Sequence, residues 1–178
     1  MTGQQGTVRD DVIVVMGPTS EPEAGFDPAY GWGAGEHVHE PLIQSTLTVT
    51  TTDLKIGYDL ATGMEASDDG LTWTVTIRDD VSFTDGEKLT AGDVAFTYNT
   101  LRDTSSVNDF TMLKEAQAVN DTTVEFHMNR PYSIWPYTMA IVGIVPEHAY
   151  GAGYGEYPVG SGRYMLKQWD KGQQVILE

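Results

Sequence analysis

The chain has 178 residues, of which 40% are hydrophobic, so it can form one domain with a buried core and is not expected to be wholly disordered. Its 10 basic and 26 acidic residues give a net charge of −16. A protein this acidic repels phosphate groups, so nucleic acids and anionic membranes are not expected as partners. The absence of cysteine excludes disulfides, thiolate metal sites and a cysteine nucleophile.

The acidic excess has two interpretations. The favoured one is a solvated, soluble surface, and the alternative is attraction of a cationic ligand. The sequence shows neither a secretory hydrophobic region nor an apolar run of membrane-spanning length.

The N-terminal third predicts short elements around an irregular segment. Residues 1–6 are polar and are interpreted as a tag or a disordered tail. Residues 12–16 form an apolar, β-branched run that predicts a buried strand. Residues 36–47 indicate a short helix. Residues 46–58 predict one or two strands with a bend at 50–53.

An antiparallel hairpin is the next predicted unit. The turn residues 68–70 separate residues 64–67 from an alternating stretch at 71–78. This alternation places one set of side chains on the same face of the sheet, namely Trp73, Val75 and Ile77.

Residues 83–98 combine a turn, a helix cap and the start of an amphipathic helix. Asp85-Gly86 supplies the backbone chemistry of a tight turn, and Thr90 with Asp93 forms a capping pair. The helix is predicted from Ala91 to about Leu101. Its core-facing residues are expected to be Val94, Tyr98 and Leu101.

The second half of the chain predicts fewer regular elements. Residues 123–128 form a strand, whereas residues 132–140 are aromatic and irregular. Residues 151–155 are rich in glycine and must form a loop. Residues 164–169 and 174–178 predict two strands joined by a turn.

Several stretches carry recognisable motifs in a fixed order. They are residues 60–78, 83–98, 119–132, 144–150 and 158–164. Together they resemble bacterial extracellular solute-binding proteins of family 5, the peptide- and nickel-binding receptors of ABC transporters. Two departures stand out. Arg163 lies where the family usually has proline, and Met64 lies where tryptophan is common.

The resemblance implies an α+β fold: a mixed β-sheet lobe with a hairpin-rich subdomain, part of a two-lobed periplasmic-binding-protein type II fold. Family members run to several hundred residues, so the chain is interpreted as an N-terminal fragment. Residues 7–178 would form a truncated N-terminal lobe. Within it, residues 46–158 would form the subdomain and residues 159–178 the return strands.

The function implied by the resemblance is solute binding for an ABC import system, outside the cytoplasmic membrane. The solute would be a peptide or another small molecule, including a metal chelate, and no cofactor or enzymatic activity is implied. The expected partners are a membrane permease and the missing C-terminal lobe. The implied location is the periplasm or the cell surface, with a lipid anchor in the full-length protein.

Two other functions compete with this interpretation. One is a carbohydrate-processing enzyme, in which aromatic side chains stack on sugars and two carboxylates cleave the glycosidic bond. The other is an interaction module that uses exposed sheet edges. The paired aspartates at 68–69 and 79–80 lie at predicted turns, where aspartate is favoured for local hydrogen bonding rather than catalysis.

Candidate site residues fall into two groups. Aromatic and large apolar side chains in irregular segments either cap the edge of a core or line a pocket, and the resemblance places these segments beside the ligand cleft. The candidates for ligand binding are Tyr30, Trp32, Tyr132, Trp135, Tyr137 and Met139. The candidates for metal binding, with a polar helix start as the alternative, are His37, His39 and Glu40.

Overall fold

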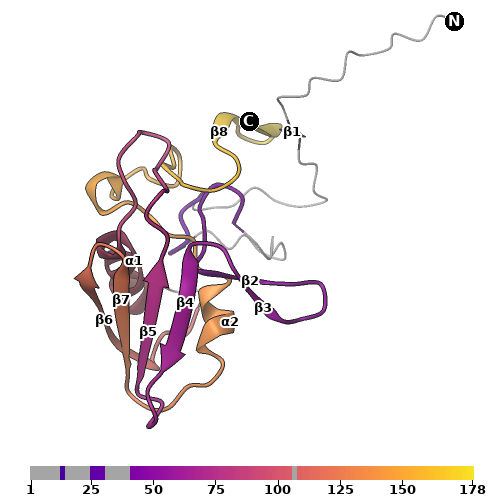
Figure 1. The fold of residues 1–178 in the computed structure, drawn as a ribbon. Helices are drawn as coiled ribbons and strands as arrows, with labels where there is room; N and C mark the ends of the chain where they lie inside the picture. The colour runs from indigo at the N-terminus through magenta and orange to yellow at the C-terminus, as the bar shows by residue number, and fades with distance from the viewer. Residues whose placement is uncertain (1–12, 15–24, 31–40, 106–107) are drawn as a thin grey trace, which may run out of the picture.

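The structure is a computed structural model that describes residues 13–14, 25–30, 41–105 and 108–178. Its strands form three sheets, in the orders β1-β9-β8, β2-β3 and β4-β5-β7-β6 (Figure 1). The strands are β1 (Ile13–Val14), β2 (Thr48–Thr50), β3 (Ile56–Tyr58), β4 (Ala61–Ala66), β5 (Thr72–Ile77), β6 (Leu113–Asn120), β7 (Thr123–Met128), β8 (Leu166–Asp170) and β9 (Gln174–Leu177). The helices are α1 (Ala91–Thr104), α2 (Trp135–Met139) and the 3-10 helix η1 (Glu147–Ala149).

The four-stranded sheet is built from two hairpins whose strands pair in the middle. β4 pairs with β5 in the first hairpin and β6 with β7 in the second, and β5 pairs with β7. The predicted alternation in β5 is confirmed. Val75 and Ile77 are buried and Trp73 is partly buried against the core, whereas Thr72, Thr74 and Thr76 occupy the alternating positions.

Helix α1 starts at the predicted cap and covers one face of this sheet. The Thr90 side chain accepts a hydrogen bond from the backbone N–H of Gly92, and the Asp93 carboxylate accepts one from the Thr90 N–H, so the capping box is confirmed. Asn99 joins the helix to β6, because its side chain both donates to the Ala116 carbonyl and accepts from the Ala116 N–H.

An aromatic cluster fills the space between α1 and the sheet. The Tyr98 ring lies 4.8 Å from Phe126 and 5.5 Å from Trp135, and Phe126 lies 5.3 Å from Trp135. All three side chains are buried. Aromatic contacts of this kind add about 0.5–1.5 kcal/mol per pair beyond area burial, so this cluster contributes to the stability of the core.

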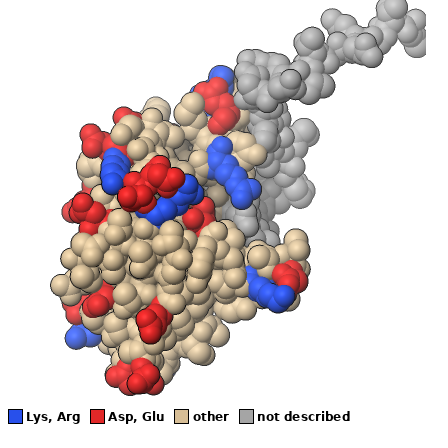
Figure 2. All heavy atoms as spheres, in the orientation of Figure 1, with Lys and Arg blue, Asp and Glu red and all other residues tan. Residues whose placement is uncertain are grey.

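The outer face of the four-stranded sheet differs in charge from the surface above it in the same view. In Figure 2 this face carries few charged side chains, whereas acidic and basic side chains gather above it in the same view. The β2-β3 hairpin projects to one side of the sheet and contacts α2, where Thr48 Oγ1 donates to the Pro136 carbonyl at 2.7 Å. No helix among the described residues is long and apolar enough to cross a membrane.

Several expectations are corrected. Strand pairs in the described parts of the chain are all antiparallel rather than mixed: β2-β3, β4-β5, β6-β7 and β8-β9 are hairpins, and the non-successive pairs β1-β9 and β5-β7 are antiparallel as well. Residues 41–47 contain no helix, and residues 36–40 lie outside the described residues. The segment 132–140, expected to be irregular, contains α2. Strand β6 was not predicted, because only Leu113 and Ala116 in it are buried and its pattern lacks a period of two.

Candidate functional site

Two chain segments that are far apart in sequence cross beside the β2-β3 hairpin. The outgoing segment, residues 41–46, and the return segment, residues 159–164, are joined by backbone hydrogen bonds. The N–H of Gly162 donates to the Ile43 carbonyl at 2.8 Å, and the N–H of Tyr164 donates to the Leu42 carbonyl at 3.1 Å. The Ser45 hydroxyl adds a bond of 2.8 Å to the Ser161 carbonyl.

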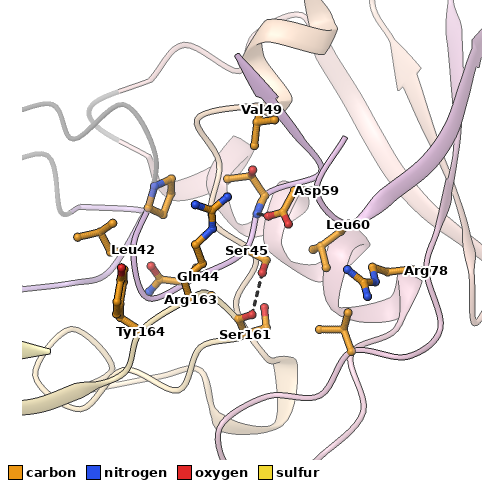
Figure 3. A pocket seen from close by; sticks show the side chains of 14 residues that line it. Leu42, Gln44, Ser45, Val49, Asp59, Leu60, Arg78, Ser161, Arg163 and Tyr164 are labelled. Carbon is orange, nitrogen blue, oxygen red and sulfur yellow. Dashed lines mark hydrogen bonds between the residues drawn. The ribbon is translucent and has the colours of Figure 1, made fainter. Parts of the chain in front are cut away.

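A hollow of about 300 Å³, called here the crossover hollow, lies at this crossing (Figure 3). Its residues come from both segments, from β2, from the residues just before β4 and from the residues just after β5. They are Pro41, Leu42, Gln44, Ser45, Thr46, Val49, Asp59, Leu60, Arg78, Val81, Ser161, Gly162, Arg163 and Tyr164. Both carboxylate and guanidinium groups therefore line it.

The charged groups of the crossover hollow differ in how they are paired. Arg78 makes two bonds to Asp80, at 2.6 and 2.8 Å, and the hydrogen bonds to Asp80 raise the pKa of Arg78. Asp59 accepts from the Thr46 N–H at 2.9 Å. Arg163 is exposed and has no ion pair within the described residues. Its guanidinium can bind an anionic group such as a carboxylate.

A second hollow, of about 420 Å³, lies between the segment 25–30 and the glycine-rich loop and is called here the loop hollow. The two segments are held by a bond of 2.8 Å from the Phe26 N–H to the Gly155 carbonyl. A Cβ atom at Gly25 would lie 2.2 Å from the same carbonyl oxygen, and the residue has φ +70°, so only glycine fits there. The lining residues are Gly25, Asp27, Tyr30, Gly151, Ala152, Gly153, Tyr154, Gly155, Glu156, Trp169 and Lys171.

Two tyrosines support the wall of the loop hollow. Tyr150 donates from its hydroxyl to Asp27 Oδ1 at 3.1 Å, and the Tyr154 hydroxyl donates to the Val159 carbonyl at 2.8 Å. Burial raises the pKa of both phenols far above the ordinary value, and Asp27 adds to the effect on Tyr150. The phenols therefore remain neutral donors at physiological pH.

Comparison with known proteins gives the family. Residues 55–178 match bacterial extracellular solute-binding proteins, family 5 Middle. The chain belongs to this family. The resemblance seen in the sequence motifs is thus confirmed.

Relatives share most of this chain but are much longer. Protein XP55 of Streptomyces lividans is 36% identical over 173 residues, which cover 91% of this chain and 31% of XP55. The structure of NikZ from Campylobacter jejuni in complex with Ni(L-His) has a TM-score of 0.78 and 26% identity, covering 88% of this chain and 33% of NikZ. AppA from Bacillus subtilis in complex with a nonapeptide has a TM-score of 0.66 and 30% identity, over 77% of this chain and 30% of AppA. The chain therefore spans about a third of the length of these family 5 relatives.

The structural likeness confirms the expected fold class. The chain is an α+β protein with antiparallel sheets, and its neighbours are two-lobed periplasmic binding proteins. Family 5 membership therefore agrees with both the sequence motifs and the arrangement of helices and strands.

The predicted ligand-binding residues occupy different environments in this family 5 chain. Tyr30 is 46% exposed and lines the loop hollow, and Tyr137 is exposed beside the β2-β3 hairpin, where its hydroxyl donates to the Leu54 carbonyl at 3.1 Å. Tyr132 is partly buried against the core. For these three residues a role in binding stays a prediction.

Two of the other candidates are core residues, and four lie outside the described residues. Trp135 and Met139 are each 0% exposed, so their side chains offer no surface to a solute, and the expectation that they line a pocket is corrected. The remaining candidates, Trp32, His37, His39 and Glu40, lie in undescribed positions. The described residues contain no group of three or more metal-ligating side chains.

The sequence predictions missed Asp27 and Arg163 as site residues. Asp27 follows Phe26 in an irregular segment, and its only sequence signal was the Asp-Pro step of a turn. Arg163 was noticed as a departure from the family motif but not as a group that lines a hollow. Both residues line hollows that are formed by segments distant in sequence, so only the structure reveals their position.

Proposed function

We propose that this protein is the solute-binding component of an ABC import system, capturing a peptide or another small solute outside the cytoplasmic membrane. The observation that carries the proposal is the family 5 match over residues 55–178. Two similar proteins were solved with small solutes, one with a nonapeptide and one with Ni(L-His), which supports a peptide or a metal chelate as the ligand class.

The hollows fit the role of half a binding site. Their volumes of about 300 and 420 Å³ are at the lower end of the range of small-molecule sites. We propose that residues 7–178 correspond to an N-terminal lobe, with a subdomain at 46–158 and return strands at 159–178. A second lobe would close over the solute and select the closed state through its higher affinity.

The partner of the loaded receptor would be the membrane permease of the transporter. The location would be the periplasm or the outer cell surface, with a lipid anchor in the full-length protein. Membership of a family of bacterial extracellular solute-binding proteins supports this placement.

The aspartates at the two predicted turns do not favour the enzyme alternative. Asp69 and Asp80 are exposed, and their hydrogen bonds to Ser67 and Arg78 lower their pKa values. A general acid in glycoside hydrolysis needs the opposite shift, which burial would supply. We therefore propose a binding protein without catalytic activity.

Binding measurements on two chains test the proposal. Thermal unfolding and calorimetry are run on the 178-residue chain and on a chain extended to the relatives' length, with peptide mixtures and nickel-histidine as probes. The melting temperature of the extended chain is expected to rise by several degrees with one class of probe. The shorter chain is expected to bind the same probe weakly. Equal, tight binding by the shorter chain would refute the need for a second lobe. Failure of the extended chain with every probe, together with hydrolysis of chromogenic glycosides, would overturn the receptor role.

A further inference from the structure

The carboxyl group of Asp27 is buried in the wall of the loop hollow and is only half satisfied. The residue is 7% exposed. Its Oδ1 atom accepts two hydrogen bonds, from the Ala29 N–H at 2.9 Å and from the Tyr150 hydroxyl at 3.1 Å. Within the described residues, Oδ2 has no hydrogen-bond partner. One oxygen thus fixes the side chain, and the other is left for a group in the hollow.

The ionised forms of the acidic and basic residues that line the loop hollow, Asp27, Glu156 and Lys171, give a net negative charge. Lys171 and Glu156 line it as well, but they form an ion pair with each other. The charge of Asp27 has no such counter-ion on the hollow's wall. Burial raises the pKa of Asp27, although the bonds from Ala29 and Tyr150 lower it in part. A cation that entered the hollow would therefore stabilise the ionised carboxylate.

Two aromatic side chains, Tyr30 and Trp169, also line the loop hollow. Tyr30 is about half exposed, and the Trp169 ring makes an edge contact with Phe26 at 5.2 Å between ring centroids. The Lys171 ammonium already lies 5.0 Å from the centroid of the Trp169 ring. The Trp169 ring is therefore already in contact with an ammonium group of the chain, and Tyr30 is the ring considered for a solute, since ring faces attract ammonium groups electrostatically.

We propose that the loop hollow is a subsite for a primary ammonium group of a small solute, bound through Asp27 Oδ2 and the ring of Tyr30. The inference rests on the proposed receptor function and narrows its solute to one with a free amine, either a peptide amino terminus or a lysine-like side chain. A metal ion fits less well, because a hard cation needs several oxygen ligands and the described residues gather no such group.

The first test is a titration of the 15N-labelled 178-residue chain with ethylammonium chloride. The expected result is saturable chemical-shift changes at the amides of Ala29 and Tyr30. Ethanol, a neutral molecule of similar size and shape, and sodium chloride at equal ionic strength are expected to leave these amides unchanged. Equal shifts with ethanol would overturn the proposal.

Variants separate a specific site from general attraction to an acidic surface. Asp27→Asn keeps the acceptor for Ala29 and Tyr150 but removes the charge, and it is expected to weaken ethylammonium binding by about tenfold or more. Asp68→Asn removes one exposed charge elsewhere and is expected to bind as wild type does. Tyr30→Ala changes a side chain that is about half exposed, so this variant is expected to keep the fold and to bind ethylammonium several-fold more weakly. Equal weakening by Asp68→Asn would leave only nonspecific charge attraction and overturn the site.

The source of the amine is decided by two peptide probes. Trialanine offers only an α-amino group, and Nα-acetyl-lysine amide offers only a side-chain amine. The probe that changes the amide chemical shift of Ala29 in the wild type but not in Asp27→Asn identifies the source of the amine. If neither does so, the subsite is overturned even where the extended chain binds a peptide. If the ethylammonium titration and a peptide-probe titration both give the expected shifts while the extended chain captures no solute, the receptor role fails and the amine site stands.

Discussion

Gly160 lies where the return segment crosses the outgoing segment, and the two backbones leave no room for a side chain. A Cβ atom at Gly160 would lie 2.0 Å from the Ile43 carbonyl oxygen and 2.7 Å from its carbon. Since both atoms belong to the backbone, no change of rotamer relieves the overlap. The segments would have to separate by roughly 1 Å or more to reach van der Waals distance.

Such a separation would break the hydrogen bonds of the crossing. The bonds at risk are those from Gly162 to Ile43 and from Tyr164 to Leu42, which measure 2.8 and 3.1 Å. Each contributes about 0.5–1.5 kcal/mol net, and residual strain adds to their loss. Gly160→Ala is therefore expected to lower the free energy of unfolding by about 2–4 kcal/mol.

Urea unfolding followed by tryptophan fluorescence measures this change. Gly151→Ala is the matched control, because a Cβ atom there meets nothing within 4 Å. The control is expected to be neutral or to stabilise by up to about 1 kcal/mol, since alanine restricts the unfolded chain. Equal urea midpoints for Gly160→Ala and Gly151→Ala would refute the idea that the close crossing constrains the fold.

Three further predictions concern a helix cap, an ion pair and a buried carboxyl group. Thr90→Ala should cost about 1 kcal/mol in the urea assay. Asp93→Ala should cost more, because this carboxylate also accepts from the first N–H of η1 at 3.0 Å, and equal losses would contradict this. The bond between Asp85 and His148 lowers the pKa of Asp85 and raises that of His148, so the pair stabilises the fold most between about pH 4 and 6.5. Its contribution fades as the pH rises through the folded pKa of His148 or falls through that of Asp85. His148→Asn should therefore lose more stability at pH 5.5 than at pH 8.5, and NMR titration of the imidazole checks the shift. Burial raises the pKa of Asp27, so stability falls as the pH rises through the window between its unfolded and folded pKa values. Asp27→Asn should then match or exceed wild type in melting temperature at pH 7, and a large loss would mean that the charge anchors the fold.

The elements that were predictable from sequence are those whose determinants lie close together in the chain. The α1 cap depends on Thr90 and Asp93, three residues apart, and both of its hydrogen bonds are present. The first hairpin depends on the turn at 68–70 and the alternation that follows it. Such local signals fix an element without knowledge of its neighbours.

The residues that sequence reasoning misplaced owe their environment to distant segments. Trp135 lies in a short aromatic stretch whose pattern fits either a core edge or a pocket wall. Its burial comes from Tyr98 and Phe126, which belong to α1 and β7. Asp27 reads as a turn residue, and its role depends on Tyr150, which is 123 residues away in sequence. No local pattern contains that information.

Two buried aspartates show how structure separates a framework residue from a site residue. Asp93 is 8% exposed, and both of its oxygens are used within the fold, by Thr90 and by the first N–H of η1. Asp27 is equally buried at 7%, yet only one of its oxygens is bonded within the described residues. The unbonded oxygen of Asp27 is not fully enclosed by the protein, so a donor that enters the loop hollow can reach it. The unequal use of the two carboxylates is therefore the physical reason to place solute recognition at Asp27 rather than at Asp93.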